Sequence, residues 1–216
     1  MYDIRKLKDR ERGNRCFILA NGPSINEYDL SKLKNEVTIG INASTLLSEK
    51  FDFTQSYYVV SDKRFFDVAM KKQLATYRLG KNTIKVFRKE IIDVYPNDID
   101  NVYYVSALER DGFSFDLYHG YYYGCTTVML AIQLASYLGI REIYLLGVDL
   151  IYNQENARFY LENEIQIDDS KSSVQIFNIV NADLAIRERG GIIYNTNPKS
   201  LIRNYLQFQD LNDLLG

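Results

Sequence analysis

Short apolar runs alternate with helical segments along the chain, and this alternation constrains the fold more than any other feature. Strands that are buried on both faces of a parallel sheet read as continuous apolar runs. We expect strands at 15–19, 37–42, 56–60, 84–87, 102–105, 142–146 and 192–195. Because helical patterns separate them, the sequence predicts an α/β fold with a mainly parallel sheet and helices on both faces.

The segment 124–138 is the clearest helix. It is apolar almost all round, which predicts a buried helix, and Gly139 is placed to end it. Further helices are expected at 63–78 and 174–188, with a C-terminal helical region that begins near 197–200.

A chain of 216 residues can bury a sizeable core as one unit, so we predict a single domain over 1–216. The polar segment 151–173 has no sustained period, and we expect a loop that serves as a lid. The two cysteines, Cys16 and Cys125, lie in apolar runs and are expected to be buried free thiols.

Charge and hydropathy exclude several classes of partner. A net charge of -2 gives no general attraction to nucleic acid, so we expect no nucleic-acid partner. No stretch approaches the roughly 20 apolar residues of a membrane span. The charged N-terminus has no apolar signal region. These features predict a cytoplasmic protein, and they leave a homo-oligomer open.

Small polar or acidic residues follow each predicted strand or open the central helix, where an open α/β sheet binds its ligands. They are Asn21, Gly22, Ser24, Asn42, Ser61, Asp62, Thr126, Thr127 and Asp149. Such side chains hydrogen-bond to bases, riboses and phosphates, and the amides at a helix start bind anions. The same residue types also favour turns and helix caps for structural reasons alone. Their convergence on one rim favours a nucleotide or nucleotide-sugar site.

The turn Asn21-Gly22-Pro23-Ser24 matches no known phosphate-binding fingerprint. No Gly-Lys-Ser/Thr follows it, and Gly-x-Gly-x-x-Gly is absent. Asp62 and Asp149 either hold Mg²⁺ together with nucleotide phosphates or cap helices. We therefore expect no obligate cofactor, with Mg²⁺ as an option at these two aspartates.

His119 is the only histidine in the chain, and it directly precedes the central helix. It is either a general base beside the predicted site or an incidental residue of an aromatic loop. One histidine and two separated cysteines make no zinc site, and a hydrolase of the Gly-x-Ser-x-Gly class is excluded because that motif is missing.

Three blocks resemble those of a known family, in the same order along the chain. They are Phe-Ile-Leu-Ala-Asn-Gly-Pro-Ser-Ile-Asn-Glu-Tyr-Asp-Leu with Ile-Gly-Ile-Asn, then Leu-Gly-Ile-Arg-Glu-Ile-Tyr-Leu-Leu-Gly-Val-Asp, then Ile-Tyr-Asn-Thr-Asn-Pro-Lys-Ser-Leu. The chain is similar to the DUF115 or MptE-like family, which is related to the Campylobacter-type sialyltransferases.

The resemblance implies a Rossmann-like sheet that binds a cytidine nucleotide such as CMP-sialic acid, with a glycan acceptor, in surface glycan or polysaccharide biosynthesis. It implies that Asn21, Gly22 and Ser24 contact the phosphate and ribose. Asn42 would contact the nucleotide, and Asp62 would face the sugar or a metal. A hydroxyl of Thr126 or Thr127 would open the central helix. Tyr152 and Tyr160 fall near the tyrosines that cradle the donor phosphate.

The chain departs from the transferases in one catalytic position. Their base histidine lies in the loop before the late helix, where this chain reads Asp168-Asp169-Ser170-Lys171-Ser172-Ser173. An inverting transfer needs a base for the acceptor hydroxyl, and the candidates are His119, Asp168 and Asp169.

Three functions follow from these observations. The first is a glycosyltransferase that uses a nucleotide-sugar. The second is an MptE-like, Mg²⁺-dependent 6-hydroxymethylpterin diphosphokinase, in which Asp62 and Asp149 would hold the metal. The third is a non-catalytic nucleotide- or glycan-binding partner, which the missing histidine favours.

Overall fold

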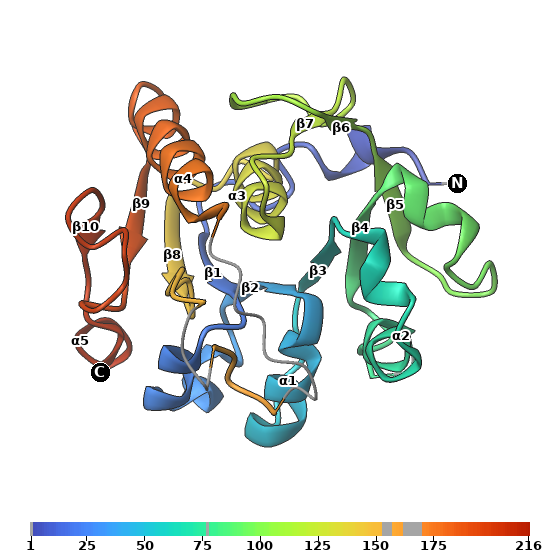
Figure 1. Cartoon of the computed structure of the whole chain (residues 1–216), viewed down its shortest axis with the longest axis horizontal. Coiled ribbons are helices and arrows are strands. Elements are labelled where there is room, and N and C mark those ends of the chain that lie inside the picture. The colour runs from blue at the N-terminus through green and yellow to red at the C-terminus, as the bar shows by residue number, and fades with distance from the viewer. Residues whose placement is uncertain (1, 77, 153–156, 162–169) are drawn as a thin grey trace.

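The computed structural model describes residues 2–76, 78–152, 157–161 and 170–216. Its centre is an eight-stranded sheet in the order β10-β9-β8-β1-β2-β3-β4-β5, and all its neighbouring strands pair in parallel (Figure 1). The strands are β1 (Arg15–Leu19), β2 (Val37–Ile41), β3 (Tyr57–Val60), β4 (Ile84–Arg88), β5 (Val102–Val105), β8 (Glu142–Leu146), β9 (Ile192–Asn195) and β10 (Gln207–Phe208). A small separate sheet pairs β6 (Ala107–Leu108) with β7 (Tyr121–Tyr122).

Helices cover both faces of the large sheet (Figure 1). α3 (Thr127–Tyr137) and α4 (Ser172–Arg187) pack on one face. The opposite face carries α1 (Thr45–Phe51), α2 (Ala69–Thr76) and α5 (Leu211–Leu215). Short 3₁₀ helices complete the connections: η1 (Ile4–Leu7), η2 (Pro23–Glu27), η3 (Leu30–Leu33), η4 (Asn42–Ser44), η5 (Lys63–Phe66) and η6 (Lys89–Asp93). The predicted α/β, Rossmann-like fold is confirmed.

The helix α3 packs on β1, β2 and β3 and is flanked by α4 and β7, which explains its apolar sequence. Ten of its residues are buried, from Thr127 to Tyr137. Its N-cap is Thr126, whose hydroxyl accepts a hydrogen bond from the Val128 amide. Gly139 follows the helix with a φ of 87°, a conformation that suits glycine at a helix end.

Two predicted helices differ from the structure. The segment 63–78 divides into η5 and α2, because Asp62 caps a 3₁₀ turn that buries the adjacent Phe65 and Phe66 together. The region after 197 forms turns, β10 and α5 in place of one helical region. There the hydroxyl of Ser200 donates to the Val148 carbonyl, a side-chain bond that holds the turn against the end of β8.

The strand order reverses beside β1. The chain runs outward from β1 to β5 and then returns to β8 on the other side of β1, before it continues to β9 and β10. Open α/β sheets bind ligands at such a switch point, beyond the carboxyl ends of the strands. Across the described residues, no helix combines the length and apolarity that crossing a membrane requires.

Candidate functional site

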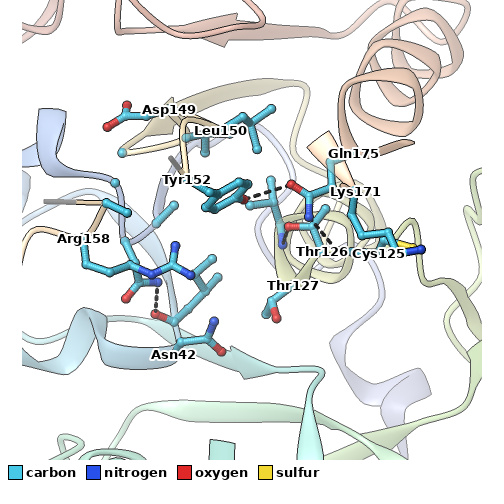
Figure 2. A pocket seen from close by; sticks show the side chains of 18 of the residues that line it. Asn42, Cys125, Thr126, Thr127, Asp149, Leu150, Tyr152, Arg158, Lys171 and Gln175 are labelled. Carbon is cyan, nitrogen blue, oxygen red and sulfur yellow. Dashed lines mark hydrogen bonds between the residues drawn. The ribbon is translucent and has the colours of Figure 1, made fainter. Parts of the chain in front are cut away.

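A cavity of about 410 Å³ opens at this switch point (Figure 2). It is bounded by the residues that follow β1, β2 and β8 and by the first turn of α3. Eight of the residues singled out from the sequence line it: Asn21, Gly22, Asn42, Asp62, Thr126, Thr127, Asp149 and Tyr152. The structure thus brings most of the predicted rim together, although these residues come from five separate segments of the chain.

Asn21 ties the end of β1 to the end of β2. Its amide Nδ2 donates to the Ile41 carbonyl at 3.2 Å, and its Oδ1 accepts from the Ala43 amide at 3.2 Å. The side chain is buried, so these bonds replace water at both groups. Asn21 therefore fixes the spacing of two strand ends that border the cavity.

Gly22 and Asp149 join β1 to β8. The Gly22 amide donates to the Gly147 carbonyl at 2.8 Å. A Cβ on Gly22 would lie 2.4 Å from Oδ2 of Asp149, so the close approach of the carboxylate requires glycine here.

The Asp149 carboxylate faces protein donors. It accepts from the Ser24 amide at 3.0 Å, from the Ser24 hydroxyl, and from Nδ2 of Asn197 at 2.7 Å. The amide and hydroxyl of Ser24 both donate to Asp149, and Ser24 does not line the cavity. Asp149 therefore anchors the turn after β1, and its carboxylate also satisfies an amide in the first turn of η2.

Asn42 has a backbone φ of 50°, a left-handed conformation that asparagine tolerates. Its main-chain carbonyl accepts from the Tyr58 hydroxyl. Its side-chain Oδ1 is buried without a hydrogen-bond partner among the described residues. Since buried acceptors are normally satisfied, this atom is suited to a donor group on a ligand.

The N-terminus of α3 forms another wall, with Thr126, Thr127 and Val128 at the cavity. The positive end of the helix dipole therefore faces the cavity. The Thr127 hydroxyl lies 2.7 Å from the Ser61 hydroxyl, which is buried behind it. Ser61 thus supports the wall without lining it.

Tyr152 connects three segments around the cavity (Figure 2). Its hydroxyl donates to Oε1 of Gln175 at 2.9 Å, and Nε2 of Gln175 donates to the Cys125 carbonyl at 2.9 Å. The guanidinium of Arg158 lies 5.4 Å from the centre of the Tyr152 ring. Burial raises the pKa of Tyr152, so the phenol stays protonated near neutral pH.

Asp62 forms an ion pair with Arg64 at the edge of the cavity. Its Oδ2 lies 2.6 Å from the guanidinium, and its Oδ1 accepts from the Arg64 amide as the cap of η5. Burial alone would raise the pKa of Asp62, but the side-chain and backbone bonds from Arg64 outweigh it and lower the pKa. Within the described parts of the chain, no group of three His, Cys, Asp or Glu residues could hold a metal ion.

His119 lies outside the cavity, contrary to the expected position beside it. Its ring nitrogen is 3.1 Å from Oδ2 of Asp116, and its side chain is 77% exposed. Residues 119–126 run along α3, since Tyr122 bonds to Gln133 in the middle of that helix. His119 is therefore near the far end of α3, where it cannot accept a proton from a ligand in the cavity.

Of the three remaining candidates, Tyr160 is the one that the structure describes. Tyr160 does not line the cavity, and its ring packs edge-on against Phe159. The Phe159 amide donates to the Asn21 carbonyl at 3.0 Å, so this part of the expected lid lies against the turn after β1. Asp168 and Asp169 lie outside the described residues.

Several cavity residues were missed by the sequence analysis: Arg64, Tyr123, Cys125, Arg158, Lys171 and Gln175. Cys125 is a free thiol at the cavity wall, which corrects its expected burial, whereas Cys16 is buried as predicted. Lys171 directly precedes α4, and its place before a predicted helix is the one signal that could have identified it.

Two solved structures share this fold. The MAf glycosyltransferase from Magnetospirillum magneticum AMB-1 matches with a TM-score of 0.61 and 15% identity, over 97% of this chain and 37% of that one. The sialyltransferase CstII from Campylobacter jejuni, solved in complex with a substrate analogue, cytidine-5'-monophosphate, matches with a TM-score of 0.57 and 14% identity, over 91% of this chain and 85% of that one.

These structural neighbours are glycosyltransferases. At such identities the likeness shows the fold, and this chain spans little more than a third of the length of the MAf protein. Neither a protein-family model nor a curated protein sequence matches the chain.

Proposed function

We propose that this protein is a glycosyltransferase that binds a cytidine nucleotide-sugar in the cavity at the switch point between β1 and β8. The observation that carries the proposal is the convergence there of the α3 N-terminus and the unpartnered Oδ1 of Asn42. An anion-binding helix start beside a buried acceptor suits a phosphate next to a base or ribose donor. The fold shared with two glycosyltransferases supports the same reaction class.

The first test is isothermal titration of the protein with CMP, CDP, UDP and ATP. We expect the cytidine nucleotides to bind more tightly than UDP and ATP, and Asn42→Ala to weaken them. If none of the four nucleotides binds, the proposed function is wrong. Turnover of CMP-sialic acid, measured as CMP release, then separates a transferase from a binding protein.

We also propose that Asp168 or Asp169 accepts the proton of the acceptor hydroxyl. Both directly precede the segment at Lys171 that reaches the cavity, in the region where the related transferases carry their base. The matched variants Asp168→Asn and Asp169→Asn should retain CMP binding, and one of them should lose transfer. Full transfer by both variants would exclude this role.

An assay of ATP consumption with and without Mg²⁺ tests the alternative diphosphokinase. That function requires Mg²⁺-dependent consumption of ATP, with Asp62 and Asp149 as metal ligands. Both carboxylates already have protein partners, so a metal would have to displace Arg64 or the donors from Ser24 and Asn197. ATP consumption that depends on Mg²⁺ and is lost in Asp62→Asn would favour the diphosphokinase over the transferase.

A further inference from the structure

The two edges of the large sheet are covered unequally. At the edge of β5, Tyr2 forms a parallel bridge to Tyr103, and the two rings lie 5.3 Å apart. At the opposite edge β10 pairs with β9, and no other described strand lies on its free side. With two residues, β10 is too short for a stable strand pair with another chain. A partner at this edge would therefore bind to the side chains around β10.

Large apolar side chains gather on this side of the molecule. Half of those that are exposed in the described part of the chain come from α4 and from the segment 201–208, which leads into β10. They are Phe177, Leu184, Leu201, Tyr205 and Phe208, each 38–60% exposed. Figure 1 shows α4, β9 and β10 at the same end of the sheet. Scattered apolar residues are ordinary on a surface, whereas a group of them marks an interaction site.

The segment 201–208 and α4 lie on the same face of the sheet. Phe208 is in register with Asn195, so its side chain points to the same side as that of Ile193, two residues earlier in β9. Ile193 lies in the core between the sheet and α4. The same core includes Ile202 and Leu206, the buried neighbours of the exposed residues in the turn before β10. The exposed apolar side chains therefore form one surface.

The exposed face of α4 has a spacing that suits a second copy of the same helix. Phe177, Val180 and Leu184 are three and four residues apart, so they form one stripe along the helix. Phe177 and Leu184 are exposed, and Val180 and Asn181 between them are half-buried. When two copies of α4 pack antiparallel about a two-fold axis beside Val180 and Asn181, Phe177 of each copy lies opposite Leu184 of the other.

The surface is also complementary at its ends and large enough for a dimer. In the antiparallel pair, the exposed Glu188 lies opposite the exposed Ser173 in the first turn of the other helix, where an acidic group is favoured. At about 200 Å² for a fully exposed side chain, the five apolar residues present roughly 500 Å². A stable interface buries about 800 Å² on each partner, of which a little over half is apolar.

We propose that the protein forms a two-fold symmetric homodimer through the outward face of α4 and the segment 201–208. None of the five apolar residues lines the cavity at the switch point. The dimer therefore goes beyond the proposed function and does not depend on it.

Sedimentation velocity of the full chain over a range of concentrations tests the proposal. We expect the wild type to sediment with twice the mass of one chain. In Phe177→Glu or Leu184→Lys, a charge faces an apolar side chain twice in the two-fold interface, so self-association should weaken about a hundredfold. Met70→Glu is the matched control, because Met70 is similarly exposed but lies on α2, on the opposite face of the sheet. It should leave self-association unchanged, and urea denaturation checks that every variant is folded.

The double variant with Phe177→Glu and Leu184→Lys tests the antiparallel pairing itself. It places an acid on each helix opposite a base on the other, so it should associate at least about tenfold more tightly than either single variant. A wild type that stays monomeric at every concentration would overturn the proposal. So would a dimer that neither single variant weakens. A double variant that associates no better than the single ones would show that the helices do not pair in this way.

A loss of the dimer and a failure of nucleotide binding are measured separately. Titration with CMP reports on the cavity whatever the mass of the protein in solution. The single variants should therefore bind CMP as the wild type does.

Discussion

The two walls of the cavity are built differently. The inner wall is formed by Asn21, Gly22 and Asp149. Ser24 and Asn197 support it from behind by hydrogen bonds to the buried Asp149 carboxylate. The outer wall consists of Tyr152, Arg158, Lys171 and Gln175, which are longer and mostly less buried. One wall therefore joins strand ends, whereas the other carries the charged side chains of Arg158 and Lys171.

The largest effect on stability is expected for Gly22→Ala in the inner wall. The new Cβ would lie 2.4 Å from Oδ2 of Asp149 and 2.5 Å from the Gly147 carbonyl oxygen. We expect a loss of about 3 kcal/mol in the free energy of unfolding, because neither neighbour can retreat without breaking its own bonds. Urea denaturation measures it.

Gly13→Ala is the matched control for that substitution. A Cβ at Gly13 would have no heavy atom within 4 Å, although its φ of 91° still disfavours alanine. The backbone strain alone should cost about 1 kcal/mol. If the two alanine variants were equally destabilised, close packing against Asp149 would not be the reason for glycine at position 22.

Asp149→Asn should give the next largest effect. The amide keeps the shape of the side chain but replaces one acceptor oxygen by a donor, so it opposes the donors from Ser24 or Asn197. We expect a loss of about 2 kcal/mol in unfolding free energy, since charged acceptors contribute more than neutral ones. Ser24→Ala, which removes one of the three bonds, should cost less. If Asp149→Asn were as stable as the wild type, the stability of the inner wall would not depend on this carboxylate.

These inner-wall residues also show how far sequence reasoning reaches. The strands were predictable because continuous apolar runs are a local signal, and the run Glu142–Leu146 is the strand β8 in the structure. The positions of Asn21, Asn42 and Asp149 at the cavity followed, because residues after parallel strands share one edge of a sheet.

The outer wall could not be predicted in the same way. Arg158 and Lys171 lie in a polar segment without periodicity, so their positions depend on contacts distant in sequence, such as Gln175 with Cys125. The distance of His119 from the cavity could not be predicted either. Its closeness to α3 in the sequence does not say which end of that helix it lies near. Likewise, β10 has two residues and gives no apolar run.

Gln175→Leu tests whether the outer wall contributes to stability at all. The substitution removes the bonds to the Tyr152 hydroxyl and to the Cys125 carbonyl, and leaves both groups without that partner. We expect a loss of about 1 kcal/mol in unfolding free energy. Tyr152→Phe, which breaks one of the two bonds, should cost less in the same denaturation experiment. A loss as large as that of Asp149→Asn would contradict the division between the walls.

The smallest effect is expected for the ion pair between Asp62 and Arg64 at the edge of the cavity. Asp62→Asn should lower the free energy of unfolding by less than about 1 kcal/mol at neutral pH, because exposed ion pairs contribute little to stability. Arg64 lowers the pKa of Asp62 below its ordinary value of 3.8. A carboxyl whose pKa is lower in the folded state stabilises the fold above the unfolded pKa and loses that contribution as pH falls through the folded pKa. The stability difference between wild type and Asp62→Asn should therefore be constant near neutrality and disappear in acid, below pH 3.8.

Urea denaturation of both proteins across this pH range measures the stability difference, with Arg64→Gln as the control that removes the same ion pair. Asparagine should largely keep the cap on η5, so a difference that persisted in strong acid would contradict the assignment of the effect to the charge of Asp62.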